Sequence, residues 1–208
     1  VGLVSLPMVW VVRRYLREPP RSVAARSTEP PPRFSDLFAT GIRERAITLF
    51  IAQFLFVWAY AASIFLFPSF LREVRALDAF NFSLLIGAGN AIGVLGYGLA
   101  AWIGERVWTR RNTVVLWTLL GAFLFQALVW VPTTFGQILF VYALMSMFFY
   151  GSAAVKFAYL AEVFPTRIRA LAMACCGSLA VTLGSAAGPY TVSLAIESWG
   201  WHLGYATL

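Results

Sequence analysis

Long runs without any charged residue are the strongest constraint in this sequence. Ala46–Leu71 contains 26 uncharged residues, Ala79–Ile103 contains 25 and Asn112–Val155 contains 44. About 20 apolar residues in a helix cross the ~30 Å hydrocarbon core of a bilayer, so each run predicts membrane-spanning helix. The run of 44 is too long for one helix, and the turn-forming segment Val131–Gly136 divides it in two.

We therefore predict an all-α membrane protein. The chain is 60% hydrophobic and 12% charged, whereas a soluble domain has roughly 25% charged residues. Five complete spans are expected, over 46–71, 79–103, 113–131, 135–161 and 168–196. Segment 1–12 is expected to end an earlier span, 13–45 to form a polar loop and 199–208 to start a last span. Because both chain ends lie in apolar segments, we expect a sequence truncated at both ends.

The arginines predict the orientation of these spans. Thirteen of the fifteen Arg residues lie in three alternate breaks between spans, and the opposite breaks hold Arg72 and Arg75. The positive-inside rule places the Arg-rich breaks in the cytoplasm. The net charge of +7 is therefore attributed to topology rather than to nucleic-acid binding. Within the long loop, 34–45 is interpreted either as an amphipathic surface helix with Leu37, Phe38 and Ile42 toward lipid or as an ordinary linker.

Two of the Arg-rich breaks carry motifs with opposite charges close together. One combines Gly104, Glu105, Arg106, Arg110 and Arg111, and Glu105 can pair with an arginine. The other runs from Glu162 through Pro165, Arg167 and Arg169. Its turn can bring Glu162 and Arg169 together, and Pro165 can end one helix or begin the next.

These motifs resemble the cytoplasmic loops of the major facilitator superfamily. The Glu162–Arg169 motif is similar to the loop between the tenth and eleventh spans, closest to the sugar-porter and metabolite:proton-symporter branches. The Gly104–Arg111 motif resembles the loop between the eighth and ninth spans, and Arg17–Arg21 resembles the signature after the sixth. The resemblance implies the C-terminal six-helix half of a twelve-span transporter, with these charges as a cytoplasmic clamp.

The same resemblance implies a function. It suggests a secondary active transporter of a small organic solute, proton-coupled and working by alternating access, in a bacterial inner membrane. The expected partners are the solute, a proton, membrane lipid and the N-terminal half of the transporter. No acidic residue lies in the middle of a span, so a proton carrier would be Glu105, Glu162 or a residue of the other half.

Polar and aromatic side chains inside the spans are candidates for a solute cavity. The candidates are Gln53, Trp58, Tyr60, Asn90, Tyr97, Tyr150 and Lys156. Their alternative role is hydrogen bonding between helices. Lys156 is the one charged residue well inside a span. We expect it to contact an anionic solute or a gate, to pair with an acid of the other half, or to snorkel toward the membrane surface.

The remaining residues argue against an enzyme. The single histidine, His202, lies at the membrane edge, and Cys175 and Cys176 have no His or acid nearby in their span. We expect no catalytic residue, no metal and no cofactor. Facilitated diffusion or drug efflux remains an alternative, as does a membrane assembly subunit that transports nothing. The repeats Gly89-x3-Gly93 with Gly96, and Gly184-x3-Gly188, predict close helix packing.

Overall fold

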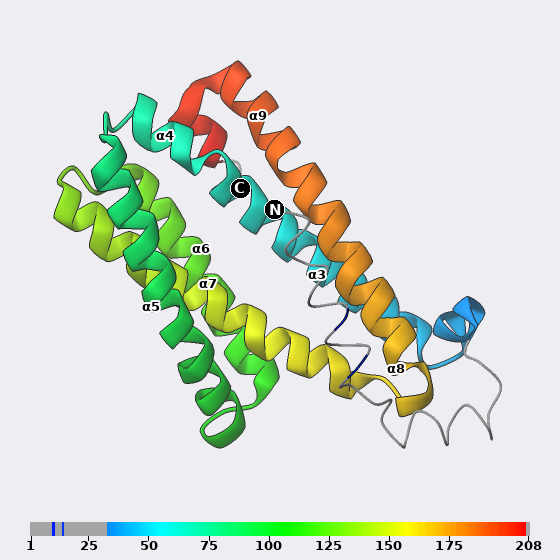
Figure 1. Cartoon of the computed structure of the whole chain (residues 1–208). Helices are drawn as coiled ribbons and strands as arrows, with labels where there is room; N and C mark the ends of the chain where they lie inside the picture. Colours follow the sequence, from blue (N-terminus) through cyan, green and yellow to red (C-terminus); the bar gives the residue numbers. More distant parts are fainter. Residues whose placement is uncertain (1–9, 11–13, 15–32, 207–208) are drawn as a thin grey trace. The chain divides into compact units, whose positions relative to one another are not determined.

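The computed structural model describes residues 10, 14 and 33–206, and the regular secondary structure of these residues is helical (Figure 1). The chain forms two compact units, Val1–Phe34 and Ser35–Leu208. The second unit contains all the candidate membrane spans among the described residues. Three predictions fall on residues that the structure does not describe, except for Trp10 and Arg14. They concern segment 1–12, the loop before residue 33 and the Arg17–Arg21 motif.

Five helical stretches of the described chain are long and apolar enough to cross a membrane. The first combines α3 (Arg43–Phe65) and α4 (Phe67–Glu73). It is followed by α5 (Ala79–Arg106), α6 (Arg110–Trp130) and α7 (Phe135–Val163). The fifth combines α8 (Thr166–Ala172), the π-helix η3 (Met173–Leu179) and α9 (Ala180–Ala206). Five complete spans are also the number predicted from the charge-free runs.

Local signals in the sequence set the helix ends. Asp78 and Thr109 cap α5 and α6, because their side chains accept hydrogen bonds from backbone N–H groups three residues later. Pro165 lies between α7 and α8, as predicted. Gly200 adopts φ 78°, a left-handed conformation that suits glycine. The last turns of α9 therefore fold back on the helix (Figure 1).

The long helices pack in two groups. In one group α3 lies along α9, and in the other α7 lies against both α5 and α6 (Figure 1). The groups are joined near α4 by a buried apolar core that includes Phe67, Phe70, Phe125, Tyr142 and Tyr205. We call this the α4 end of the bundle, and the other the Arg-rich end.

Glycines allow close contact within each group, as their spacing predicted. A Cβ atom on Gly184 would lie 2.8 Å from the carbonyl oxygen of Phe54, and one on Gly188 would lie 2.8 Å from the backbone nitrogen of Ala62. Both contacts join α9 to α3. On α5, Gly96 faces the backbone of Met147 on α7 in the same way. Close backbone approach of this kind drives helix association where burial from water contributes nothing.

The segment before the first span differs from the amphipathic helix considered for 34–45. It forms a short 3₁₀ helix, η2 (Phe34–Phe38), and α3 starts separately at Arg43. Leu37 is buried in an apolar cluster with Ala46, Phe164 and Ile168, while Phe38 is exposed. Leu37 therefore packs against protein, so of the two interpretations of 34–45 the amphipathic helix with Leu37 toward lipid is wrong.

Candidate functional site

A cavity of about 210 Å³ lies between α3 and α7, with further walls from α5 and α9. Five of the seven predicted solute-contact residues line it: Gln53, Tyr60, Tyr97, Tyr150 and Lys156. They come from three helices, and the cavity lies where the two helix groups face each other. A wider groove of about 590 Å³ follows along α3 and α7 toward the Arg-rich end, where Glu44, Thr48, Tyr159 and Glu162 line it.

Hydrogen bonding and ring stacking fix one wall of the cavity. The hydroxyl of Tyr150 donates a hydrogen bond of 2.7 Å to Oδ1 of Asn90 on α5. The rings of Tyr97 and Tyr150 stack with centroids 5.7 Å apart. Asn90 does not line the cavity itself, but it holds a side chain that does. For Asn90 and Tyr150, this contact is the hydrogen bond between helices that the sequence analysis gave as the alternative to solute contact.

A second part of the lining is aromatic and is centred on Tyr60. Its ring stacks with that of Phe56, at 6.4 Å between centroids, and meets the edge of Phe149 at 5.6 Å. Gln53, one helical turn from Phe56, is 4% exposed. The wall combines flat apolar rings with an amide and hydroxyl groups, a mixture typical of small-molecule sites.

Lys156 extends into this cavity rather than toward the membrane surface. Its ammonium lies over the ring of Phe56. Its Nζ is buried and has no hydrogen-bond partner among the described residues. Lys156 therefore does not adopt the snorkelling arrangement.

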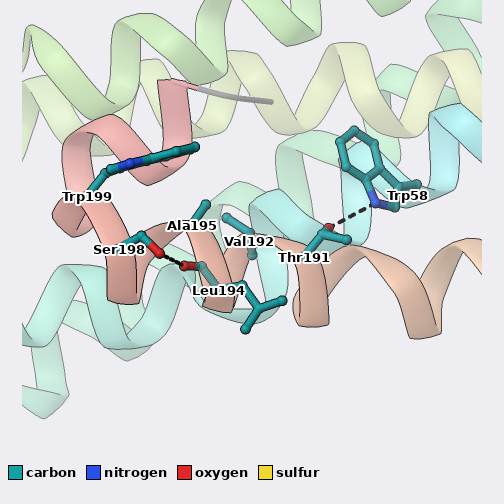
Figure 2. A pocket seen from close by; sticks show the side chains of 7 residues that line it. All are labelled: Trp58, Thr191, Val192, Leu194, Ala195, Ser198 and Trp199. Carbon is teal, nitrogen blue, oxygen red and sulfur yellow. Dashed lines mark hydrogen bonds between the residues drawn. The ribbon is translucent and has the colours of Figure 1, made fainter.

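Trp58 lies outside the cavity. Its indole Nε1 donates a hydrogen bond of 3.0 Å to Oγ1 of Thr191, and it lines a separate groove of about 340 Å³ along α9 (Figure 2). The groove continues past Val192 to Ser198 and Trp199. Trp58 thus connects α3 to α9 instead of contributing to the cavity with Lys156.

Several lining residues were not predicted from the sequence. They are Phe56, Val57, Phe149, Ala153, Phe157, Val181 and Ser185. Those on α3 recur with Gln53 and Tyr60 at the three- and four-residue spacing of one helix face. Residues three or four positions from Gln53 and Lys156 share their helix faces, so this spacing would have identified the lining residues on α3 and α7. Val181 and Ser185 on α9 carry no such signal.

Gly93 makes room for the Tyr150 ring, and this predicts a specific mutational coupling. A Cβ atom on Gly93 would overlap that ring. Gly93→Ala is therefore expected to move Tyr150 away from Asn90 and Tyr97, with a destabilisation of about 1–3 kcal/mol. In detergent, Gly93→Ala should lower the thermal unfolding temperature of the wild-type protein clearly, but should lower that of a Tyr150→Ala variant only slightly. Gly87→Ala, on the same helix with open space around its Cβ, is the matched control; equal losses in both backgrounds would contradict the coupling.

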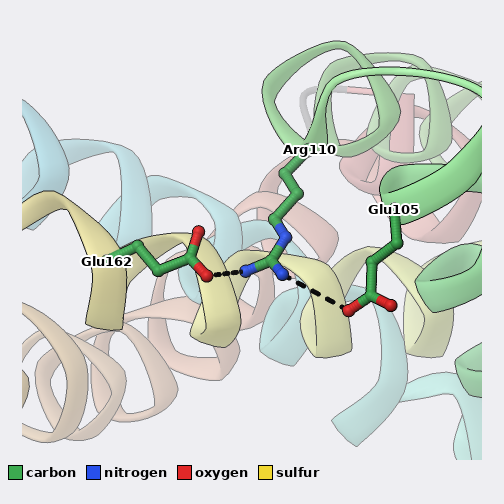
Figure 3. A network of polar contacts seen from close by, with 3 residues as sticks. All are labelled: Glu105, Arg110 and Glu162. Atoms are coloured by element: carbon green, nitrogen blue, oxygen red, sulfur yellow. Dashed lines mark hydrogen bonds and ion pairs between the residues drawn. The ribbon is translucent and has the colours of Figure 1, made fainter.

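An ionic cluster lies at the Arg-rich end of the bundle. Arg110, at the start of α6, forms ion pairs with Glu162 near the end of α7 and with Glu105 near the end of α5, the latter at 3.3 Å (Figure 3). The Arg110 side chain is 25% exposed and the two carboxylates about 60% (61% and 59%). One guanidinium with several donors in a fixed plane can hold two carboxylates from different helices.

The cluster confirms that Glu105 pairs with an arginine but gives Glu162 a different partner from the one expected. Glu162 binds Arg110, whereas Arg169 is exposed on α8 without an ion pair among the described residues. Arg167 instead pairs with Asp36 at 3.3 Å, a contact that no sequence pattern indicated. Arg106 and Arg111 are exposed, and Gly104 is buried beside Val155 and Thr113.

Comparison with known proteins places these features in a family. Residues 49–208 match the model of the Major Facilitator Superfamily, a region that includes every residue lining the cavity and all three members of the ionic cluster. The comparison with curated proteins gave no match. The match covers most of the chain and agrees with its five apolar helices. The chain therefore belongs to the major facilitator superfamily of transporters and is an integral, multi-pass membrane protein.

Proposed function

We propose that this chain forms the C-terminal half of a twelve-span secondary active transporter that moves a small organic solute by alternating access. The observation that carries the proposal is the cavity between α3 and α7, at the junction of two separately packed helix groups. Solute sites of transporters lie near the middle of the membrane between helical units that rock against each other. The cavity is midway along both helices and combines hydroxyl, amide and aromatic groups.

The orientation and coupling extend this proposal. The Arg-rich end faces the cytoplasm of a bacterial inner membrane, in agreement with the distribution of arginine. The solute is an organic acid or a sugar-like metabolite, transported together with protons. The N-terminal half of the same transporter closes the other side of the cavity. The Glu105–Arg110–Glu162 cluster holds the cytoplasmic side closed in one of the two alternating states.

Labelling of the cavity from both sides of the membrane tests alternating access. In the complete transporter with Cys175 and Cys176 replaced by serine, Ser185→Cys places one thiol in the cavity wall. We expect a membrane-impermeant thiol reagent to label it from either face, in right-side-out and in inside-out vesicles. Ser83→Cys, an exposed position near the α4 end of α5, should be labelled from one face. Labelling of the Ser185→Cys variant from one face alone would contradict alternating access.

A further inference from the structure

The Lys156 amine is the one basic group in a cavity that holds no other charged side chain, and no described residue supplies a counter-ion for it. The other residues that line the cavity are aromatic, aliphatic, amide or hydroxyl residues, and none is acidic. Nζ is buried and makes no hydrogen bond to the described residues. A buried charge is costly unless it is paired. In its protonated form, Lys156 therefore needs an anion that the described residues of the cavity do not supply.

The nearest carboxylate along α7 does not supply that charge. Glu162 is six residues, or about 9 Å along the helix, from Lys156. It is bound to Arg110, which also holds Glu105. The Phe56 ring lies against the ammonium instead. A cation–π contact is weaker than an ion pair with a carboxylate in the same surroundings, so an incoming anion can displace the ring.

The rest of the cavity selects for a flat apolar body. The rings of Tyr60 and Phe149 meet edge to face, and those of Tyr97 and Tyr150 are stacked. Aromatic rings favour such offset or edge contacts with another ring. The described walls enclose about 210 Å³, a volume that suits a small molecule.

We propose that the cavity binds a small aromatic monocarboxylate, with its carboxylate on Lys156 and its ring between the tyrosine and phenylalanine side chains. The inference rests on the proposed transport function and names the solute class for the same cavity. Binding transfers the ammonium from the Phe56 ring to the carboxylate. A dicarboxylate would bury a second negative charge without a cation, and a neutral solute would leave Lys156 unpaired.

The test measures binding to the complete transporter in detergent by isothermal titration. Benzoate is the probe, benzamide is its neutral counterpart of similar shape, and phthalate adds a second carboxylate. We expect saturable binding of benzoate, and binding of benzamide and phthalate that is weaker by about tenfold or more. Lys156→Gln should weaken benzoate binding by a similar factor, while Lys156→Arg, which keeps the charge, should retain most of it.

Arg72→Gln is the matched control variant. Arg72 also lies over a phenylalanine ring, that of Phe82, but on α4 and outside the cavity. Its removal should leave benzoate affinity unchanged. Equal benzoate affinity in wild type and Lys156→Gln would overturn the proposal, as would benzamide binding as tightly as benzoate. So would the absence of benzoate binding in folded wild-type protein.

The two proposals fail in different ways. If the Ser185→Cys variant is labelled from both faces but benzoate does not bind through Lys156, the solute class is wrong and transport by alternating access stands. If labelling occurs from one face alone, alternating access itself is wrong. Uptake of a neutral hexose that is insensitive to Lys156→Gln would also contradict the carboxylate assignment while supporting transport.

Discussion

Replacing Arg110 with glutamine is expected to reduce solute uptake by the complete transporter by about tenfold or more, a change equivalent to about 1.4 kcal/mol. Arg110 holds Glu105 and Glu162, which belong to different helices (Figure 3). Without the guanidinium, two carboxylates face each other within the group of α5, α6 and α7. The arrangement of these helix ends that closes the cytoplasmic side in one of the two proposed states then loses stability. Since alternating access needs both states, uptake falls even though the solute cavity is intact.

Charge exchange separates this role from a general need for positive charge at the Arg-rich end. Arg110→Glu combined with Glu162→Arg restores the pair between α6 and α7 and should recover part of the uptake, whereas each single change should not. Arg43→Ala removes an exposed arginine at the same end and is the matched control. Normal uptake in Arg110→Gln, at unchanged protein levels in the membrane, would contradict the clamp.

Gly188→Ala is expected to lower the thermal unfolding temperature clearly, although alanine favours helix by about 1 kcal/mol over glycine. The added Cβ would overlap the carbonyl oxygen of Trp58 and lie 3.2 Å from Cβ of Ala61. Backbone atoms cannot rotate away, so α9 must separate from α3, at a cost of about 1–3 kcal/mol for overpacking. Gly188→Leu should lower the unfolding temperature further than Gly188→Ala, because the side chain of leucine is larger.

Gly98→Ala provides the comparison for this substitution. A Cβ at Gly98 meets nothing within 4 Å, so the helix preference of alanine should leave stability unchanged or slightly increased. Tryptophan fluorescence of the purified variants during heating measures both effects, with Trp58 beside the altered contact. Equal unfolding temperatures for the Gly188→Ala and Gly98→Ala variants would show that the α3–α9 contact contributes little.

The helices themselves were predictable because the bilayer imposes a simple rule. A long run with few or no charges forms a helix there, and the structure has helices over all five predicted spans. The rotation of each helix about its axis was not predictable in the same way. Helices that are apolar on all sides show no preferred face in their sequence, and Trp58 was therefore assigned to the cavity although it faces α9.

The partner of Glu162 illustrates a similar limit for the ionic cluster. Arg110, Arg111, Arg167 and Arg169 all lie in the same two breaks at one end of the bundle. Sequence separation favours Arg169, but packing of α6 against α7 brings Arg110 to the carboxylate. Five of the seven predicted residues do line the cavity, and they were identified because polar groups inside a span are rare and costly. The apolar lining residues lack that signal.

The π-helix η3 has a consequence for how the fifth span contacts α3. Each residue of an α-helix turns by about 100°, so twelve residues of unbroken α-helix would leave Ala172 and Gly184 about 120° apart in direction. Yet Ala172 packs in the cluster with Ala46 of α3, and Gly184 contacts Phe54 and Trp58 of the same helix. Each residue of the π-helix Met173–Leu179 turns by less than an α-helical residue. Over the segment, these smaller turns offset the ~120° and keep Ala172 and Gly184 on the same side of the span. If this segment wound as ordinary α-helix at the same length, the glycine stripe would therefore point about 120° away from its neighbour, whereas deletion of one residue would bring it back to within about 20°.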